Sequence, residues 1–209
     1  YGTSMAGGYT RWFSAGERRP SGRLMVMDRE KIYAFGRLNQ YDHVGSHVGL
    51  GKMQYLLYAA NRSDFPAPQA PSRRGAKPKR GPRWDQKKPD IPTRWSGRID
   101  LLARGMVLSG GTLFIAGPPD LFGVAPGEAP HPYTLVSPEA LRSQREALEG
   151  KKGTLLWAVD AASGRKLSET KLAGLSAWDG LIAANNRIYM TMQDGTVICL
   201  SGAAAAPTE

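Results

Sequence analysis

The sequence predicts an all-β fold made of repeated four-stranded antiparallel units. Three segments share one pattern, a strand, a short polar turn and a second strand, at residues 22–36, 105–117 and 180–192. A further strand of a different kind follows each of them, at residues 55–61, 154–160 and 196–201. After residue 160 the chain turns again and continues as a fourth strand. Four antiparallel strands repeated along a chain are typical of β-propeller blades, whereas the alternative is an antiparallel β-domain with long loops and no repeat.

The turns inside the three hairpins favour this interpretation. They fall at Asp28-Arg29-Glu30, at Ser109-Gly110-Gly111 and at Asn185-Asn186. Gly, Asn and Asp either tolerate positive φ or bond their own backbone, which short hairpins require. The flanking residues are β-branched, aromatic or methionine and include no proline, as expected of strands.

Two insertions explain why the units lie farther apart than the roughly 40–50 residues usual for blades. The first, residues 63–93, is rich in proline and carries most of the basic excess behind the net charge of +10. It has few large aliphatic residues, so we expect a disordered, solvated surface loop that does not bind nucleic acid specifically. The second, residues 118–152, contains a predicted short helix over 138–149. The strand at 154–160, the last hairpin and a tail at 203–209 follow this insertion in the chain.

The helix prediction rests on its ends. Ser137 is a capping residue, Pro138 suits the first helical position and Gly150 ends the helix. Leucine and alanine residues give it a weak apolar stripe, and we expect the helix to lie on the propeller rim; the residues of the stripe are Ala140, Leu141, Ala147 and Leu148.

Several kinds of chemistry find little support in the sequence. No run approaches the roughly 18 apolar residues of a membrane span. The chain does not start with Met, and its first residues do not resemble a signal peptide, so we expect it to be part of a longer protein. Cys199 is the single cysteine and its apolar surroundings predict burial. His43 and His47 lie among glycines, which favours a loop over a helical zinc site. Four aspartates are expected to cap turns, and no catalytic residue or metal site is predicted; they are Asp28, Asp160, Asp179 and Asp194.

One stretch resembles a known repeat. Ala158, Asp160, Ser163, Gly164 and Arg165 match the pattern A-x-D-x-x-[ST]-G-[KR] of the PQQ-like repeat in quinoprotein dehydrogenase-like β-propellers. The repeat closes with a tryptophan, where this chain has Ser168. In the preceding repeat, Trp95 fits that position. The wider chain, with Trp157 in Leu156–Val159 and with Trp178-Asp179-Gly180, is similar to the C-terminal part of PQQ-binding-like propellers of planctomycete-type bacteria over most of residues 22–201, the first insertion excluded.

The resemblance implies that residues 1–209 form part of a propeller. About two and a half blades are visible, whereas complete propellers have typically 4–8, so we expect an incomplete ring whose missing blades come from upstream sequence. The function it favours is a non-catalytic binding or scaffolding propeller of the periplasm, cell envelope or exterior, with a protein partner. One alternative is a PQQ-dependent oxidoreductase that uses PQQ with calcium through residues mostly upstream; another is a propeller like the assembly factor of outer-membrane protein insertion. We expect no cofactor in this chain itself, because one cysteine cannot supply the vicinal pair of that enzyme family.

Overall fold

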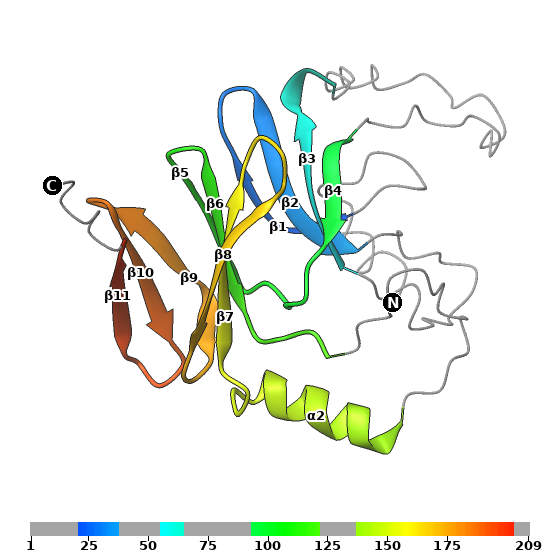
Figure 1. Cartoon of the computed structure of the whole chain (residues 1–209), viewed down its shortest axis with the longest axis vertical. Coiled ribbons are helices and arrows are strands. Elements are labelled where there is room, and N and C mark those ends of the chain that lie inside the picture. Colours follow the sequence, from blue (N-terminus) through cyan, green and yellow to red (C-terminus); the bar gives the residue numbers. More distant parts are fainter. Residues whose placement is uncertain (1–20, 38–54, 65–92, 122–136, 203–209) are drawn as a thin grey trace, which may run out of the picture.

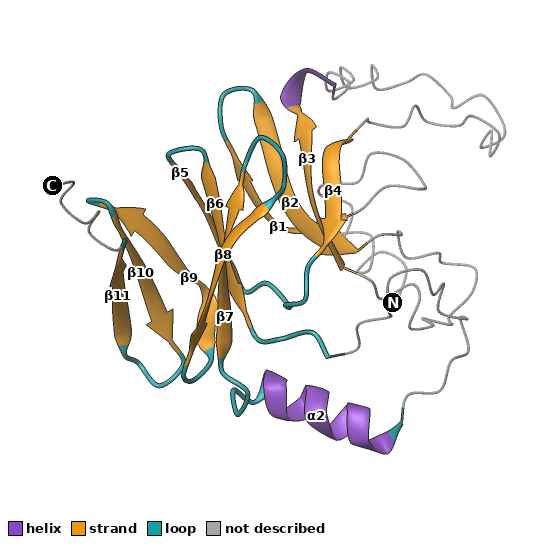
Figure 2. Cartoon of the chain, in the orientation of Figure 1, coloured by secondary structure: helices purple, strands orange, loops and turns teal. Residues whose placement is uncertain are grey.

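The computed structural model describes residues 21–37, 55–64, 93–121 and 137–202, which form three antiparallel sheets and one α-helix (Figure 1, Figure 2). The strands of the first sheet are β1 (Ser21–Met27), β2 (Lys31–Arg37), β3 (Tyr55–Asn61) and β4 (Thr93–Arg98). Those of the second are β5 (Gly105–Ser109), β6 (Thr112–Gly117), β7 (Thr154–Asp160) and β8 (Lys166–Leu172). Those of the third are β9 (Ser176–Ala184), β10 (Arg187–Met192) and β11 (Val197–Ser201). The all-β prediction with four-stranded antiparallel units is therefore confirmed, and the third unit has three strands within the described residues.

Two of the hairpins turn through paired residues with positive φ, as predicted. Gly110 and Gly111 have φ of 55° and 76°, and Asn185 and Asn186 have φ of 50° and 56°. This pair of left-handed residues is the geometry of a type I′ turn, whose twist matches that of the flanking strands. In the first hairpin of the chain, between β1 and β2, the Asp28 carboxylate accepts hydrogen bonds from the backbone N–H groups of Glu30 (2.8 Å) and Lys31 (2.6 Å).

The strand register makes the first two sheets equivalent residue by residue. Ala59 of β3 lies opposite Trp95 of β4, and Ala158 of β7 lies opposite Ser168 of β8. A bulge follows each alanine at the same place. Trp95 and Ser168 therefore occupy the same position in successive sheets, which is the alignment that the sequence predicted.

The third sheet follows the same register. Asp160 pairs with the first residue of β6, and Ser201 pairs with Arg187, the first residue of β10. Gly202 consequently stands where Ala161 stands in the second sheet.

The sheets stack face to face around two hydrophobic interfaces. Buried side chains of the first sheet, Tyr33, Phe35 and Leu57, belong to one cluster with Ile115 and Trp157 of the second. A smaller cluster joins the second sheet to the third; its buried members are Ala116, Leu156, Leu181, Ile188, Met190 and Met192. β5 contacts both β1 and β9, so the first strands of the three sheets lie side by side (Figure 1).

Helix α2 (Pro138–Leu148) lies beside the second sheet and ends one residue before the predicted boundary (Figure 2). Ser137 caps it as expected, since its Oγ accepts from the N–H of Ala140 at 3.2 Å. Of the apolar stripe, Ala147 is buried, whereas Leu141 is 52% exposed and Leu148 50%; the polar Gln144 is buried in their place. The Gln144 amide explains this, because it accepts from the N–H of Leu121 (2.7 Å) and donates to the carbonyl of Pro119 (3.2 Å).

Several predicted features lie outside the described residues. They are most of the basic insertion at 63–93, the part of the second insertion at 122–136, the tail at 203–209, and His43 and His47. The short 3₁₀ turn η2 (Arg62–Asp64) leads from β3 into the first insertion. Within the part of the chain that the structure describes, no helix combines the length and the apolar character needed to cross a membrane.

Candidate functional site

The matched repeat motif forms a closed turn between β7 and β8. One carboxylate oxygen of Asp160 accepts from the N–H of Ser163 (2.7 Å) and from its hydroxyl (2.6 Å). The N–H of Gly164 donates to the carbonyl of Asp160 at 2.8 Å, and Gly164 has φ of 76°. The Ser163 hydroxyl, and after it the Ser163 N–H, lower the pKa of the exposed Asp160 carboxyl. The Asp160 carboxylate therefore forms its hydrogen bonds within its own turn, and the motif residues stabilise that turn.

Trp95 connects the first sheet to that turn. Its indole Nε1 donates to the carbonyl of Ala161 at 3.1 Å, across the first interface. A Cβ at Gly164 would lie 2.6 Å from Cε3 of the Trp95 ring, which is closer than any real contact. Gly164 is thus required by its φ and by the indole that lies on it. The Tyr33 ring also contacts Trp95, with ring centroids 6.3 Å apart.

Tyr33 links the contact between Trp95 and the β7–β8 turn to the turn of the first hairpin. Its hydroxyl donates to the Asp28 carboxylate at 3.3 Å. Burial is the main cause that raises the pKa of Tyr33 to about 12, and the nearby Asp28 charge adds to it. The phenol therefore stays protonated at neutral pH and serves as a donor.

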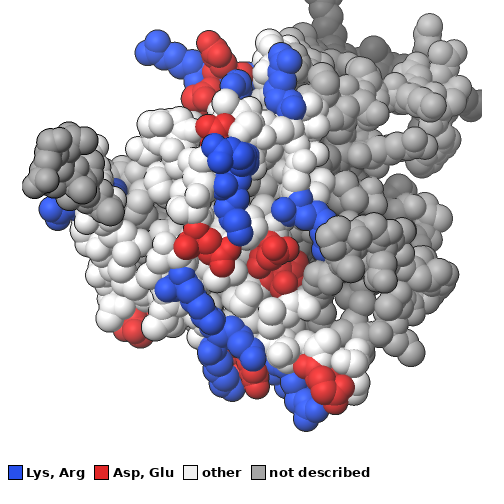
Figure 3. All heavy atoms as spheres, in the orientation of Figure 1, with Lys and Arg blue, Asp and Glu red and all other residues white. Residues whose placement is uncertain are grey.

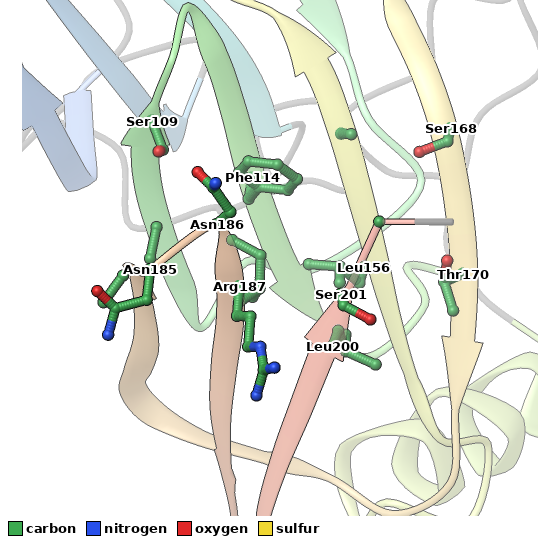
Figure 4. A pocket seen from close by; sticks show the side chains of 15 residues that line it. Ser109, Phe114, Leu156, Ser168, Thr170, Asn185, Asn186, Arg187, Leu200 and Ser201 are labelled. Carbon is green, nitrogen blue, oxygen red and sulfur yellow. The ribbon is translucent and has the colours of Figure 1, made fainter. Parts of the chain in front are cut away.

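The second interface has a cavity where the first has an indole. Ser168 replaces the tryptophan, and a cavity of about 770 Å³ opens between β8 and the β9–β10 hairpin. Ser168 and Thr170 lie on one side of it, and Asn185 and Asn186 lie on the other (Figure 4). The apolar side chains that line it are Phe114, Leu156, Ala158, Ala183, Ile188 and Leu200.

The remaining residues of the motif have different environments. Trp157 is 6% exposed in the first interface, and the Lys166 ammonium lies 4.2 Å from its ring centroid. Its buried Nε1 finds no hydrogen-bond partner among the described residues. Ala158 lines the cavity, and the N–H of Arg165 donates to the Ser163 hydroxyl at 3.3 Å.

A cluster of arginine and tryptophan lies along the first strands of the three sheets. The Arg23 guanidinium of β1 sits 4.8 Å from the ring centroid of Trp178 in β9, and Trp178 is 47% exposed. Arg104, just before β5, has a buried Nε that lacks a hydrogen-bond partner within the described part of the chain. Desolvation, and then the Arg23 charge, lower the pKa of Arg104. Arg23 and Arg104 could not be identified from the sequence, since only the stacking of the sheets brings them together.

Asp179 is a correction to the sequence prediction. It lies inside β9 and not in a turn, because β9 begins at Ser176 and includes an irregularity opposite Met190–Met192. Asp179 has φ of 56°, and its N–H donates to the carbonyl of Arg104 at 2.7 Å. Gly180 follows in the same strand, where a Cβ would lie 3.1 Å from Cβ of Thr191. Trp178, Asp179 and Gly180 therefore form a bulge that fixes β9 beside β5.

The predicted burial of Cys199 is also wrong. Cys199 is exposed, because its side chain points to the face of the third sheet that is turned away from the second. Ile182 (61% exposed) and Val197 (63%) share that face. No described element covers it.

Charges are mixed over the surface in Figure 3, where acidic and basic side chains of the described residues lie among one another. Among the same residues, no three His, Cys, Asp or Glu side chains gather where they could hold a metal ion. No protein-family model and no curated protein matches the chain. The described surface thus has three notable features, a lined cavity, an arginine–tryptophan cluster and an apolar sheet face.

Proposed function

We propose that the chain is an arc of a β-propeller that acts by binding a protein partner and not by catalysis, in the periplasm, the cell envelope or outside the cell. Three sheets with equivalent registers, stacked with their first strands side by side, support the propeller. The bare apolar face of the third sheet is where the next blade of a ring would lie. Sequence upstream of this chain would supply the missing blades.

The arginine–tryptophan cluster of Arg23, Arg104 and Trp178 carries the proposal. Tryptophan and arginine dominate the binding energy of protein interfaces, because they offer a large apolar surface together with directed donors. Here a half-exposed indole lies under one guanidinium, and the second guanidinium has a buried Nε with no described acceptor. Neither arginine forms an ion pair with a described carboxylate. The partner that fits is an extended acidic segment, whose carboxylates would supply the acceptors.

A titration of the full chain with a fluorescently labelled glutamate-rich peptide tests the proposal. We expect saturable binding that weakens as salt rises, because exposed charges are screened. Trp178→Ala and Arg23→Gln should each weaken binding by about tenfold, in the range of an interface hot spot. Arg145→Gln on α2 removes the same charge from an exposed site elsewhere and should leave the affinity unchanged. A loss in Arg145→Gln as large as that in Arg23→Gln, with no loss in Trp178→Ala, would mean unspecific charge attraction and would overturn the proposal.

The same cluster favours one other function. An exposed indole with two arginines also suits a planar quinone that bears carboxylates, as in the PQQ-dependent oxidoreductase that the resemblance implies. A parallel titration with PQQ, with and without calcium, separates the two. Saturable, calcium-dependent quenching of tryptophan fluorescence that the peptide does not compete for would favour the oxidoreductase. Recovery of outer-membrane proteins with the chain would instead favour the assembly-factor alternative.

A further inference from the structure

The two sheet interfaces can be compared position by position. In the first, the Trp95 indole lies between the outer strand of one sheet and the turn of the next, and it donates to the carbonyl of Ala161. In the second, Ser168 holds the position of Trp95, and Gly202 holds the position of Ala161. Both Ser168 and Gly202 line the cavity of about 770 Å³. The cavity therefore occupies the place that an indole fills one interface earlier.

The lining of the cavity resembles that of small-molecule sites. Its volume lies in the usual range of about 300–1,000 Å³, and such sites combine an apolar floor with a few polar groups. The aromatic face of Phe114 and the side chains of Leu156 and Leu200 supply the floor (Figure 4). Phe114 occupies the register position of Tyr33, the ring that contacts Trp95 in the first interface.

The polar groups that line the cavity carry no charge. Hydroxyl and amide groups surround its mouth. Arg187 borders the cavity, but in β10 it alternates with the buried Ile188 and shares a face with Tyr189 and Cys199, so its side chain lies on the outer face of the third sheet. No described carboxylate lines the cavity. An apolar cavity with uncharged polar groups complements a neutral ligand.

We propose that this cavity binds a neutral planar aromatic compound of about the size of indole. The ring takes the place that Trp95 occupies in the first interface, over Phe114 and Leu156. A ring N–H donates to the carbonyl of Gly202, as the Trp95 indole donates to that of Ala161. This site lies between two sheets, away from the cluster on the first strands, so it is independent of the proposed protein partner.

Titration of the full chain with indole, followed by ligand-observed NMR, tests the proposal. We expect saturable binding, with 1-methylindole binding about fivefold more weakly, since it lacks the N–H that the Gly202 carbonyl accepts. Arg187→Gln, on the outer face of the sheet, should leave both affinities unchanged. Equal affinities for the two probes would overturn the assignment of the ring N–H.

A second experiment fills the cavity with a side chain of the protein. Ser168→Trp places its own indole in the cavity and should abolish binding of both probes. Lys171→Trp makes the same substitution on β8, on the opposite face of the strand, and should bind as the wild type does. Where Ser168→Trp fails to fold, Thr170→Phe at the exposed rim takes its place and should weaken binding at least tenfold. Absence of saturable binding to the wild type, or binding that survives the filled cavity, would overturn the proposal.

Discussion

Gly164 meets two independent requirements at a single position. Its φ of 76° lies in the left-handed region, and the Trp95 ring covers the space where a Cβ would stand. Gly110 has a similar φ of 55° but open space around it. The two glycines separate the energetic cost of backbone conformation from the cost of a blocked contact.

Gly110→Ala should lower the free energy of unfolding by about 1 kcal/mol, the cost of a left-handed alanine. Gly164→Ala should lower it by about 3 kcal/mol, because overpacking against the Trp95 ring adds to that cost. In a Trp95→Ala background, Gly164→Ala should lower the free energy of unfolding only by the amount expected for Gly110→Ala. Urea denaturation of the single and double variants gives the coupling energy. Additive effects would show that Trp95 does not lie on Gly164 in solution.

Three aspartates in turns are expected to make the free energy of unfolding depend on pH in the acid range. Hydrogen bonds lower the pKa of each carboxyl: chiefly the Lys31 N–H for Asp28, the Ser163 hydroxyl for Asp160 and the Thr196 N–H for Asp194. The unfolded chain, with ordinary values near 3.8, then binds more protons than the folded chain as the pH falls below that value. The stabilisation is complete above this pH and is lost as the pH falls through the lowered values.

Ser163→Ala should make this acid loss smaller, because it removes the largest cause of the Asp160 shift. Ser109→Ala removes an exposed hydroxyl from another turn and should keep the wild-type profile. Thermal melting between pH 2 and pH 7 measures both. A Ser163→Ala profile identical to that of the wild type would assign the acid transition to other groups.

At the scale of the elements, α2 is held by a polar side chain. The buried Gln144 amide bonds the chain on both sides of Asp120, through Pro119 and Leu121, while Leu141 and Leu148 stay half exposed. The helix therefore joins the start of the second insertion to its end.

Gln144→Leu should destabilise the protein by about 2 kcal/mol, because it leaves a donor and an acceptor unpaired. Leu141→Ala should change the stability by less than about 0.5 kcal/mol, as at ordinary surface positions. Urea denaturation measures both variants. The reverse order would restore the apolar stripe that the sequence predicts.

At the scale of the whole molecule, the bare face of the third sheet dominates the surface properties. Ile182, Val197 and Cys199 lie together on it, beside the unpaired edge of β11 within the described chain. Contiguous exposed apolar side chains next to a free strand edge promote association between chains.

We expect the chain to self-associate as its concentration rises, and Ile182→Lys with Val197→Lys to shift it toward the monomer. Leu141→Lys places the same charge at an exposed leucine on α2 and should leave the association unchanged. Light scattering after size-exclusion chromatography reports the mass at each concentration. A monomeric wild type at every concentration would contradict the prediction.

The local structure could be read from the sequence because local chemistry determines it. Paired glycines and asparagines, and an aspartate before Ser163, dictate the turns that the structure contains. The apolar neighbours of Cys199 could not show whether its face of the sheet has a neighbour, and the predicted burial of Cys199 was wrong for this reason.

The parts of the site that the sequence missed all depend on contacts between elements. Arg23 and Arg104 meet only because β1 and β5 lie side by side, and the Asp179 bulge depends on Arg104. The cavity had one visible sign, the serine at position 168 where the repeat calls for tryptophan.

The unequal interfaces set an order in which the protein loosens. The first interface has the larger buried cluster and the Trp95 hydrogen bond, whereas the second has fewer buried side chains and a cavity. Local opening follows the weakest packing, so the backbone amides of β10 should exchange with deuterium sooner than those of β2 and β6. The third sheet is thus expected to separate first in local opening. The first and second sheets then stay packed together, and their amides exchange slowly.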